Sequence, residues 1–147
     1  MELVTGEFRN TLDDKGRLSL PAKLRAGLGA NVLVVTQGVD SCLWLFTPER
    51  WNALSEQLFA TTSLFHQQAR IIQRRIIAPA QEVEIDKAGR IAIPQSLREF
   101  AGLTKDCIVL GITKRLEIWD ADAYKSWIDS TEAEFAAASE ALDIQNL

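Results

Sequence analysis

The chain has 147 residues, 47% of them hydrophobic and 24% charged, and its 16 basic and 20 acidic side chains give a formal net charge of -4. This composition is typical of one globular domain and excludes general disorder and fibrous repeats. No apolar run is long enough to cross a membrane, and the N-terminus lacks the basic and apolar segments of a secretory signal. Two distant cysteines, Cys42 and Cys107, predict reduced, buried thiols in a cytoplasmic protein.

The first elements along the chain are two short strands joined by a tight loop. Residues 6–12 are a strand candidate because their second-copy counterpart, 82–85, alternates cleanly between polar and apolar side chains, and residues 17–20 alternate between polar or small and aliphatic side chains, which predicts the returning strand. The loop Asp14-Lys15-Gly16 ends on glycine, as a three-residue hairpin loop with a left-handed residue does. Pro21 then stops the second strand and suits the start of a short helix, which Gly29 ends.

Two buried strands and two helical runs follow. The apolar segments 32–35 and 42–46 predict the strands. Thr47 before Pro48 is typical of an N-cap and a first helical position, and this helix is expected to reach Phe59. A second helical run is expected to start near Ser63.

The same series of elements recurs 73 residues further along the chain. The segment from Asp13 to Pro21 is echoed by the segment from Asp86 to Pro94, and nine positions are identical between the windows 13–51 and 86–124. Two copies are too few for a solenoid, and they predict a pseudo-dimer folded from one chain. The second-copy elements are strands at 82–85 and 90–93, the loop 87–89, a helix at 95–101, and strands at 107–110 and 116–119.

The C-terminal part is expected to be one long amphipathic helix. Asp120 opens it, apolar side chains recur at helical spacing as far as Leu142, and residues 143–147 are expected to fray. The predicted organisation is a single domain with repeats at 6–51 and 79–124, connecting helices at 52–78, and an acidic helix at 125–147.

The charges are segregated along the chain. Residues 116–147 hold eight acids and one base, a sum of -7, and the remaining residues sum to +3. Two basic clusters stand out: Lys15, Arg17, Lys23 and Arg25, and then Arg70, Arg74 and Arg75. The ordinary interpretation of such a cluster is a solvated face.

The element Asp-x-x-x-Arg, which occurs in both loops, has two interpretations. Asp13 with Arg17, and Asp86 with Arg90, are placed to pin the loops as ion pairs, with Gly16 and Gly89 supplying the turns. A ribbon tipped by Lys15 and Arg17, or by Lys87 and Arg90, also suits the major groove, because Arg binds guanine and Lys neutralises phosphate.

On these motifs the chain resembles the MraZ family of bacterial transcriptional regulators, which carry two AbrB-like repeats. The resemblance runs from Gly6 to about Trp127, and the segments 101–103 and 116–120 are also similar. It implies an α+β, β-rich fold in which both repeats build a swapped-hairpin (AbrB-like) β-barrel with flanking helices. It implies Lys15, Arg17, Lys87 and Arg90 as DNA contacts. Lys87 is one position earlier in its loop than Lys15, so the first loop is expected to dominate.

The resemblance also implies a functional setting. The protein is expected to form ring-like homo-oligomers, octamers or larger, and to repress its own cell-division and cell-wall operon at the nucleoid in the cytoplasm. A ring of head-to-tail contacts points neighbouring loops the same way, which suits direct repeats in DNA spaced about 10 bp apart. Several weak contacts then add through multivalency.

The sequence gives less support to functions other than DNA binding. His66 is the only histidine, and no nucleophile motif, metal cluster, P-loop or dinucleotide-binding motif is present, so neither an enzyme nor a bound cofactor, metal or small-molecule substrate is expected. The competing hypothesis is an antitoxin-like interaction module whose C-terminal helix binds a partner, with DNA binding secondary. The amphipathic pattern of that helix weighs against it, because antitoxin tails are usually disordered in composition.

Overall fold

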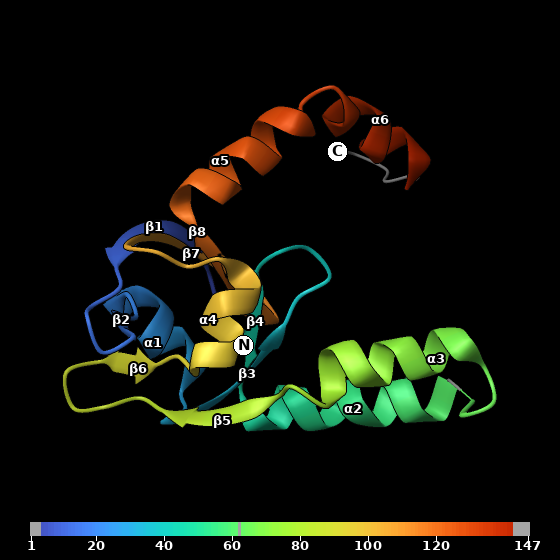
Figure 1. Cartoon of the computed structure of the whole chain (residues 1–147), viewed down its shortest axis with the longest axis horizontal. Coiled ribbons are helices and arrows are strands. Elements are labelled where there is room, and N and C mark those ends of the chain that lie inside the picture. Colours follow the sequence, from blue (N-terminus) through green and yellow to red (C-terminus); the bar gives the residue numbers. More distant parts are fainter. Residues whose placement is uncertain (1–3, 62, 143–147) are drawn as a thin grey trace.

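The computed structural model describes residues 4–61 and 63–142, which form a mixed α+β fold (Figure 1). The strands are β1 (Thr5–Thr11), β2 (Arg17–Ser19), β3 (Val32–Gln37), β4 (Leu43–Phe46), β5 (Gln81–Glu84), β6 (Arg90–Ala92), β7 (Asp106–Ile112) and β8 (Arg115–Asp120). The helices are α1 (Ala22–Leu28), α2 (Pro48–Thr61), α3 (Gln67–Ile72), the π-helix η1 (Gln73–Ile77), α4 (Gln95–Ala101), α5 (Ala121–Ser130) and α6 (Glu134–Ala141). Within these ranges, no helix is both long and apolar enough to span a lipid bilayer.

The strands of the two repeats are interleaved. Six strands form one antiparallel sheet in the order β1-β7-β8-β4-β3-β5, and β2 and β6 form a separate two-stranded ribbon. The first strand of each repeat therefore pairs with a strand of the other repeat, β1 with β7 and β5 with β3. Because β1 and β5 are the edges of the larger sheet, the described strands form an open sheet and a ribbon, and the closed barrel implied by the resemblance is not present among them.

The prediction of a locally paired hairpin is wrong for both repeats. The turn itself forms, since the Asp13 amide donates to the Arg17 carbonyl at 2.9 Å and the Asp86 amide donates to the Arg90 carbonyl at 2.9 Å. Beyond this bond the two strands diverge, β1 to the larger sheet and β2 to the ribbon. The pairing of β2 with β6 buries Leu18 and Ile91 in the core that the two repeats share, which a hairpin formed within one repeat would not do.

The offset between equivalent residues of the two repeats is not 73 throughout: β4 and β8 correspond at 73 residues, but β3 and β7 correspond at 74. Gln37 lies opposite Leu43, and Gly111 lies opposite Leu116, so the structural counterpart of Gly111 is Gln37 and not Gly38. The extra residue lies in a loop, because the segment between α4 and β7 is longer than the segment between α1 and β3. Within each hairpin the register keeps the apolar side chains facing the core, which a one-residue slip inside a strand would reverse.

Both repeats contribute to one hydrophobic core. The ribbon places Leu18 and Ile91 in it, and the short helices α1 and α4 add Leu24 and Leu97. A second, smaller apolar cluster lies around Trp119, whose ring contacts Tyr124 and Trp127 of α5. Neither repeat closes a core without the other, so the interleaved strands and the shared core hold the loops of both repeats in one unit.

The helices after the repeats differ from the predicted ones in two places. The run expected near Ser63 begins at Gln67 and continues into η1, and the expected continuous C-terminal helix is broken into α5 and α6. At the break, the Thr131 hydroxyl donates to the carbonyls of Trp127 and Ile128, so it competes with the helical backbone bonds. The expected fraying of residues 143–147 lies outside the described residues. The helix opens at Asp120 as predicted, and Asp120 is its N-cap, because the carboxylate accepts from the Ala123 amide at 3.1 Å.

The prediction of two buried, unbridged cysteines is confirmed. Cys42 and Cys107 are both free and fully buried. Burial raises the pKa of the Cys42 thiol to about 12 and that of the Cys107 thiol to about 11, with nearby carboxylates adding to the effect. Both thiols are therefore held protonated and unreactive, and they act as small apolar side chains.

Candidate nucleic-acid interface

The site is built from two loops at the β2–β6 ribbon, loop 1 (residues 13–17) and loop 2 (residues 86–90). Each closes as a tight turn in which the glycine amide donates back to the aspartate carbonyl, Gly16 to Asp13 at 3.0 Å and Gly89 to Asp86 at 2.9 Å. The turn requires a left-handed residue, and the φ angles of Gly16 and Gly89 are 76° and 79°. The two loops therefore have the same backbone geometry.

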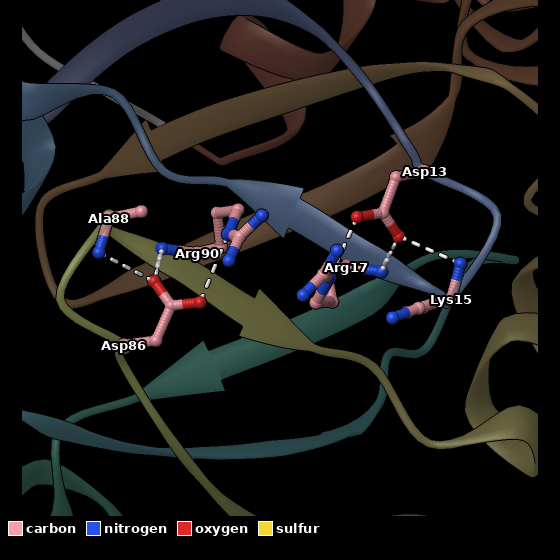
Figure 2. A network of polar contacts seen from close by, with 6 residues as sticks. All are labelled: Asp13, Lys15, Arg17, Asp86, Ala88 and Arg90. Atoms are coloured by element: carbon pink, nitrogen blue, oxygen red, sulfur yellow. Dashed lines mark hydrogen bonds and ion pairs between the residues drawn. The ribbon is translucent and has the colours of Figure 1, made fainter.

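Each aspartate holds its loop and its arginine at the same time (Figure 2). In loop 1, Asp13 Oδ1 accepts from the amides of Lys15 and Arg17 at 2.9 and 2.8 Å, and Asp13 Oδ2 accepts from Arg17 Nε at 2.7 Å. In loop 2, Asp86 Oδ1 accepts from the amides of Ala88 and Arg90, both at 2.9 Å, and Asp86 Oδ2 accepts from Arg90 Nε at 3.0 Å. One carboxylate thus fixes both the turn and the direction of a guanidinium group.

The same contacts keep the two carboxylates ionised. Hydrogen bonds from the backbone amides of Arg17 and Arg90 are the main cause that lowers the pKa of Asp13 and Asp86, although partial desolvation opposes it. The arginine side chains and the amides of Lys15 and Ala88 lower these pKa values further. Both ion pairs are therefore fully formed at neutral pH.

The two arginines lie on one face of the ribbon. Arg17 is opposite Ala92 and Ser19 is opposite Arg90, so these four side chains share the outer face while Leu18 and Ile91 fill the core on the other. Arg17 and Arg90 occupy diagonal positions, which places their backbones roughly 7–8 Å apart. Their side chains are 32% and 34% exposed, and the ion pairs with Asp13 and Asp86 engage Nε rather than the Nη groups.

The lysines of the two loops are placed differently. Lys15 and Lys87 are both exposed. In loop 1 the backbone amide of Lys15 donates to Asp13, whereas in loop 2 the equivalent amide, which donates to Asp86, belongs to Ala88. Loop 1 contains two acids and two bases and is formally neutral, whereas loop 2 contains one acid and two bases and carries +1. Formal charge therefore favours loop 2 for binding an anion, in contrast to the expectation from the sequence that loop 1 dominates.

Sequence reasoning missed two further arginines at the site. The guanidinium group of Arg98, from the second repeat, lies against the Cα of Gly16, and that of Arg25, from the first repeat, lies against the Cα of Gly89. The signal was already present, because Arg25 and Arg98 are one of the nine identical pairs of the duplication. The second basic cluster and the histidine are not part of this site. Arg70 donates to the Leu64 carbonyl in the segment after α2, and His66 is exposed in the same segment.

A metal site does not accompany the loops. Among residues 4–61 and 63–142, no three His, Cys, Asp or Glu side chains gather closely enough to hold a metal ion. The buried carboxylate of Glu117 is instead bound by protein donors, since Arg115 Nη2 donates to it at 2.8 Å and the indoles of Trp44 and Trp119 donate at 3.1 and 2.9 Å. This cluster pins strands β4 and β8 together.

Comparison with known proteins gives consistent matches over both repeats. A family model described as "MraZ protein, putative antitoxin-like" matches residues 3–75 and 76–146, two segments that start 73 residues apart. Transcriptional regulator MraZ of Treponema denticola is 53% identical over 139 residues, covering 95% of this chain and 96% of the relative. The protein of that name in Treponema pallidum (strain Nichols) is 50% identical over 138 residues, covering 94% and 93%, and the one in Ligilactobacillus salivarius is 46% identical over 130 residues, covering 88% and 90%.

Proposed function

This chain belongs to the MraZ family, and we propose that it is a transcriptional regulator that binds double-stranded DNA through loop 1 and loop 2. The observation that carries the proposal is the shared outer face of the ribbon, where Arg17 and Arg90 are each held by an aspartate. An arginine whose direction is fixed before binding loses little conformational freedom on contact with a base.

The geometry suits the major groove of B-DNA. That groove admits a two-stranded ribbon, and an arginine can bind guanine O6 and N7 with its two Nη groups. Lys15 and Lys87 are exposed beside the arginines and would neutralise phosphates, which sets the register of the protein on the duplex. The acidic helices α5 and α6 lead away from the sheets (Figure 1), so their charge lies at a distance from the loops.

Two helical arms support the proposal of self-assembly. The basic arm, α2 to η1, leaves several apolar side chains exposed: Phe59, Leu64, Phe65 and Ile71. The acidic arm, α5 and α6, does the same, and it forms an apolar groove that includes Trp127, Ile128, Phe135 and Leu142. The two arms also carry charges of opposite sign, with Arg70, Arg74 and Arg75 on the basic arm and Glu132, Glu134 and Glu140 on the acidic arm, which suits contact between copies.

Two different surfaces that bind each other produce a head-to-tail assembly, which closes as a ring when the rotation permits. We propose a ring of eight or more copies, as the family resemblance implies, binding direct repeats in its own promoter. Repression of the chain's own cell-division and cell-wall operon, at the nucleoid in the cytoplasm, follows from such a position on the DNA. Multivalency then gives a useful affinity to loops that carry little net charge.

A gel shift on the DNA upstream of the protein's own gene tests the proposal. Arg17→Ala and Arg90→Ala should each weaken binding by at least about fivefold, because a bidentate contact to guanine contributes about 1–3 kcal/mol per site. Lys114→Ala is the control, since it removes one positive charge from the exposed β7–β8 turn, which lies at the end of β1 opposite to loop 1. Equal affinities for wild type and both arginine variants would rule out the role of the loops.

A further inference from the structure

The contacts of Arg25 and Arg98 connect each loop to the helix of the other repeat. Arg98 Nη1 donates to the Ile93 carbonyl at 2.5 Å, and the Ile93 amide donates to the Gly16 carbonyl at 2.9 Å. The guanidinium group of Arg98 also lies against Gly16. The three residues form a closed ring of contacts around the turn of loop 1.

The same ring surrounds loop 2 with the repeats exchanged. Arg25 Nε donates to the Leu20 carbonyl at 3.0 Å, the Leu20 amide donates to the Gly89 carbonyl at 2.9 Å, and the guanidinium group of Arg25 lies against Gly89. A Cβ atom on Gly89 would come within 2.6 Å of Arg25 Cζ, so a larger residue would displace this guanidinium group, and the left-handed backbone favours glycine as well. The glycine and the arginine that covers it thus depend on each other.

We propose that Arg98 is a positioning residue for loop 1 and Arg25 is a positioning residue for loop 2, so that each loop is completed by the opposite repeat. Without the guanidinium group, the glycine turn is uncovered on one side and the amides held by Asp13 or Asp86 open more often. The consequence for DNA rests on the function proposed above, but the structural coupling does not.

The same placement changes the charge of each loop. Loop 1 is formally neutral by itself and becomes +1 with Arg98, and loop 2 rises from +1 to +2 with Arg25. Both arginines are half-buried and fixed by a carbonyl, so their charge sits at a constant position beside the turn. The cationic surface offered by one loop is therefore made by both repeats.

Amide hydrogen exchange of the full-length protein without DNA tests the coupling, with Arg98→Ala, Arg25→Ala and the exposed α1 control Lys23→Ala. In Arg98→Ala, exchange in loop 1, including the amides of Lys15 and Arg17, should accelerate by about threefold or more, while loop 2 stays as in wild type. Arg25→Ala should give the reverse pattern, and Lys23→Ala should change neither loop. Acceleration in the loop of the same repeat, or in neither loop, overturns the proposal.

A general loss of stability is distinguished by a second variant. Arg98→Lys keeps the charge and most of the stem but lacks the planar group, so it should still accelerate loop 1 selectively. If this variant leaves loop 1 at the wild-type rate, or accelerates both loops equally, the guanidinium group does not position the loop. If each arginine variant accelerates exchange in the loop of the other repeat, but Arg17→Ala binds DNA as tightly as wild type, the coupling stands and the DNA-binding proposal fails. If exchange is unchanged but Arg17→Ala weakens DNA binding, the DNA-binding proposal stands and the coupling fails.

Discussion

Leu18 and Ile91 lie directly opposite each other in the β2–β6 ribbon, and both side chains are 0% exposed. Each comes from a different repeat, and each is flanked on the outer face of the ribbon by the arginine of its own loop. The packing of this pair in the core therefore fixes the position of the ribbon. The ribbon in turn fixes the distance between Arg17 and Arg90.

Removing one member of this pair should lower stability substantially. Leu18→Ala deletes a fully buried side chain and leaves a cavity, so the free energy of unfolding should fall by about 2–5 kcal/mol. Ser19→Ala, on the outer face of the same strand, is the matched control and should stay within about 0.5 kcal/mol of wild type. Urea denaturation at one fixed protein concentration measures both, because self-association would otherwise change the apparent stability.

The two roles of the loop glycines can be separated with the glycine that ends α1. Gly16 has φ 76° and lies under Arg98, whereas Gly29 has φ 62° and, among the described residues, no neighbour within 4 Å of the place that a Cβ atom would take. Gly29→Ala should therefore cost only the backbone strain, about 1–2 kcal/mol, and Gly16→Ala should cost more. In the double variant Gly16→Ala with Arg98→Ala, the extra cost should shrink; purely additive losses in unfolding free energy would contradict crowding by the guanidinium group.

Lowering the pH should weaken the loops only in strongly acidic solution. The pKa values of Asp13 and Asp86 are lowered below the ordinary 3.8 in the folded state, so their contribution to stability is complete above that value. It is lost as the pH falls through the folded pKa. The difference in unfolding free energy between wild type and Asp13→Asn should thus be constant between about pH 5 and about pH 8 and shrink below about pH 4. A difference that declines near about pH 6 would point to another titrating group.

The salt dependence of DNA binding should report the two lysines. Each phosphate neutralised by a lysine releases counterions, so log K should fall linearly with log salt, and Lys15→Ala or Lys87→Ala should reduce the slope by about one per bound loop. Sequence preference should change little, because phosphate contacts carry no base information. Titrations at several salt concentrations, with operator and unrelated DNA, measure both quantities. If the slope of log K against log salt is unchanged in both variants, the lysines do not contact the DNA phosphates.

Self-assembly should depend on the two arms. Phe65 is 93% exposed and Phe135 is 74% exposed, so Phe65→Ser or Phe135→Ser should lower the mass in light scattering without unfolding the protein. Val39→Ser is the control, since Val39 is 72% exposed but lies in the β3–β4 loop, off both arms. A wild-type monomer would refute the ring, and it would leave the apolar groove of the acidic arm for another protein, as the antitoxin-like alternative requires.

Local patterns predicted much of this fold because local chemistry determines it. Pro21 and Gly29 bound α1 as expected, and the glycine of each loop adopts the left-handed turn. Strand pairing could not be obtained in this way. A glycine-ended loop between two alternating segments is the same whether the strands continue together or separate, and only the shared core decides that β1 pairs with β7.

The miss at Arg25 and Arg98 has a related cause. Each arginine lies on a short helix of ordinary composition, and its partner glycine is in the other half of the chain. Spacing within one repeat cannot indicate a contact made between repeats. The break at Thr131 was missed because the apolar spacing of the C-terminal segment continues across it, and the hydroxyls of Ser130 and Thr131 that bond the Trp127 carbonyl there leave no mark in that spacing.

The interleaving of β1 with β7 and of β5 with β3 also bears on what kind of DNA sequence the protein can distinguish. Two identical single-repeat chains exchanging these strands would present the same loop twice and would favour a palindrome. Joining the two halves in one gene removes that constraint, because each copy of the loop can then mutate independently. The change from Asp14-Lys15 in loop 1 to Lys87-Ala88 in loop 2 is such a divergence, and it makes the two ends of the ribbon chemically different.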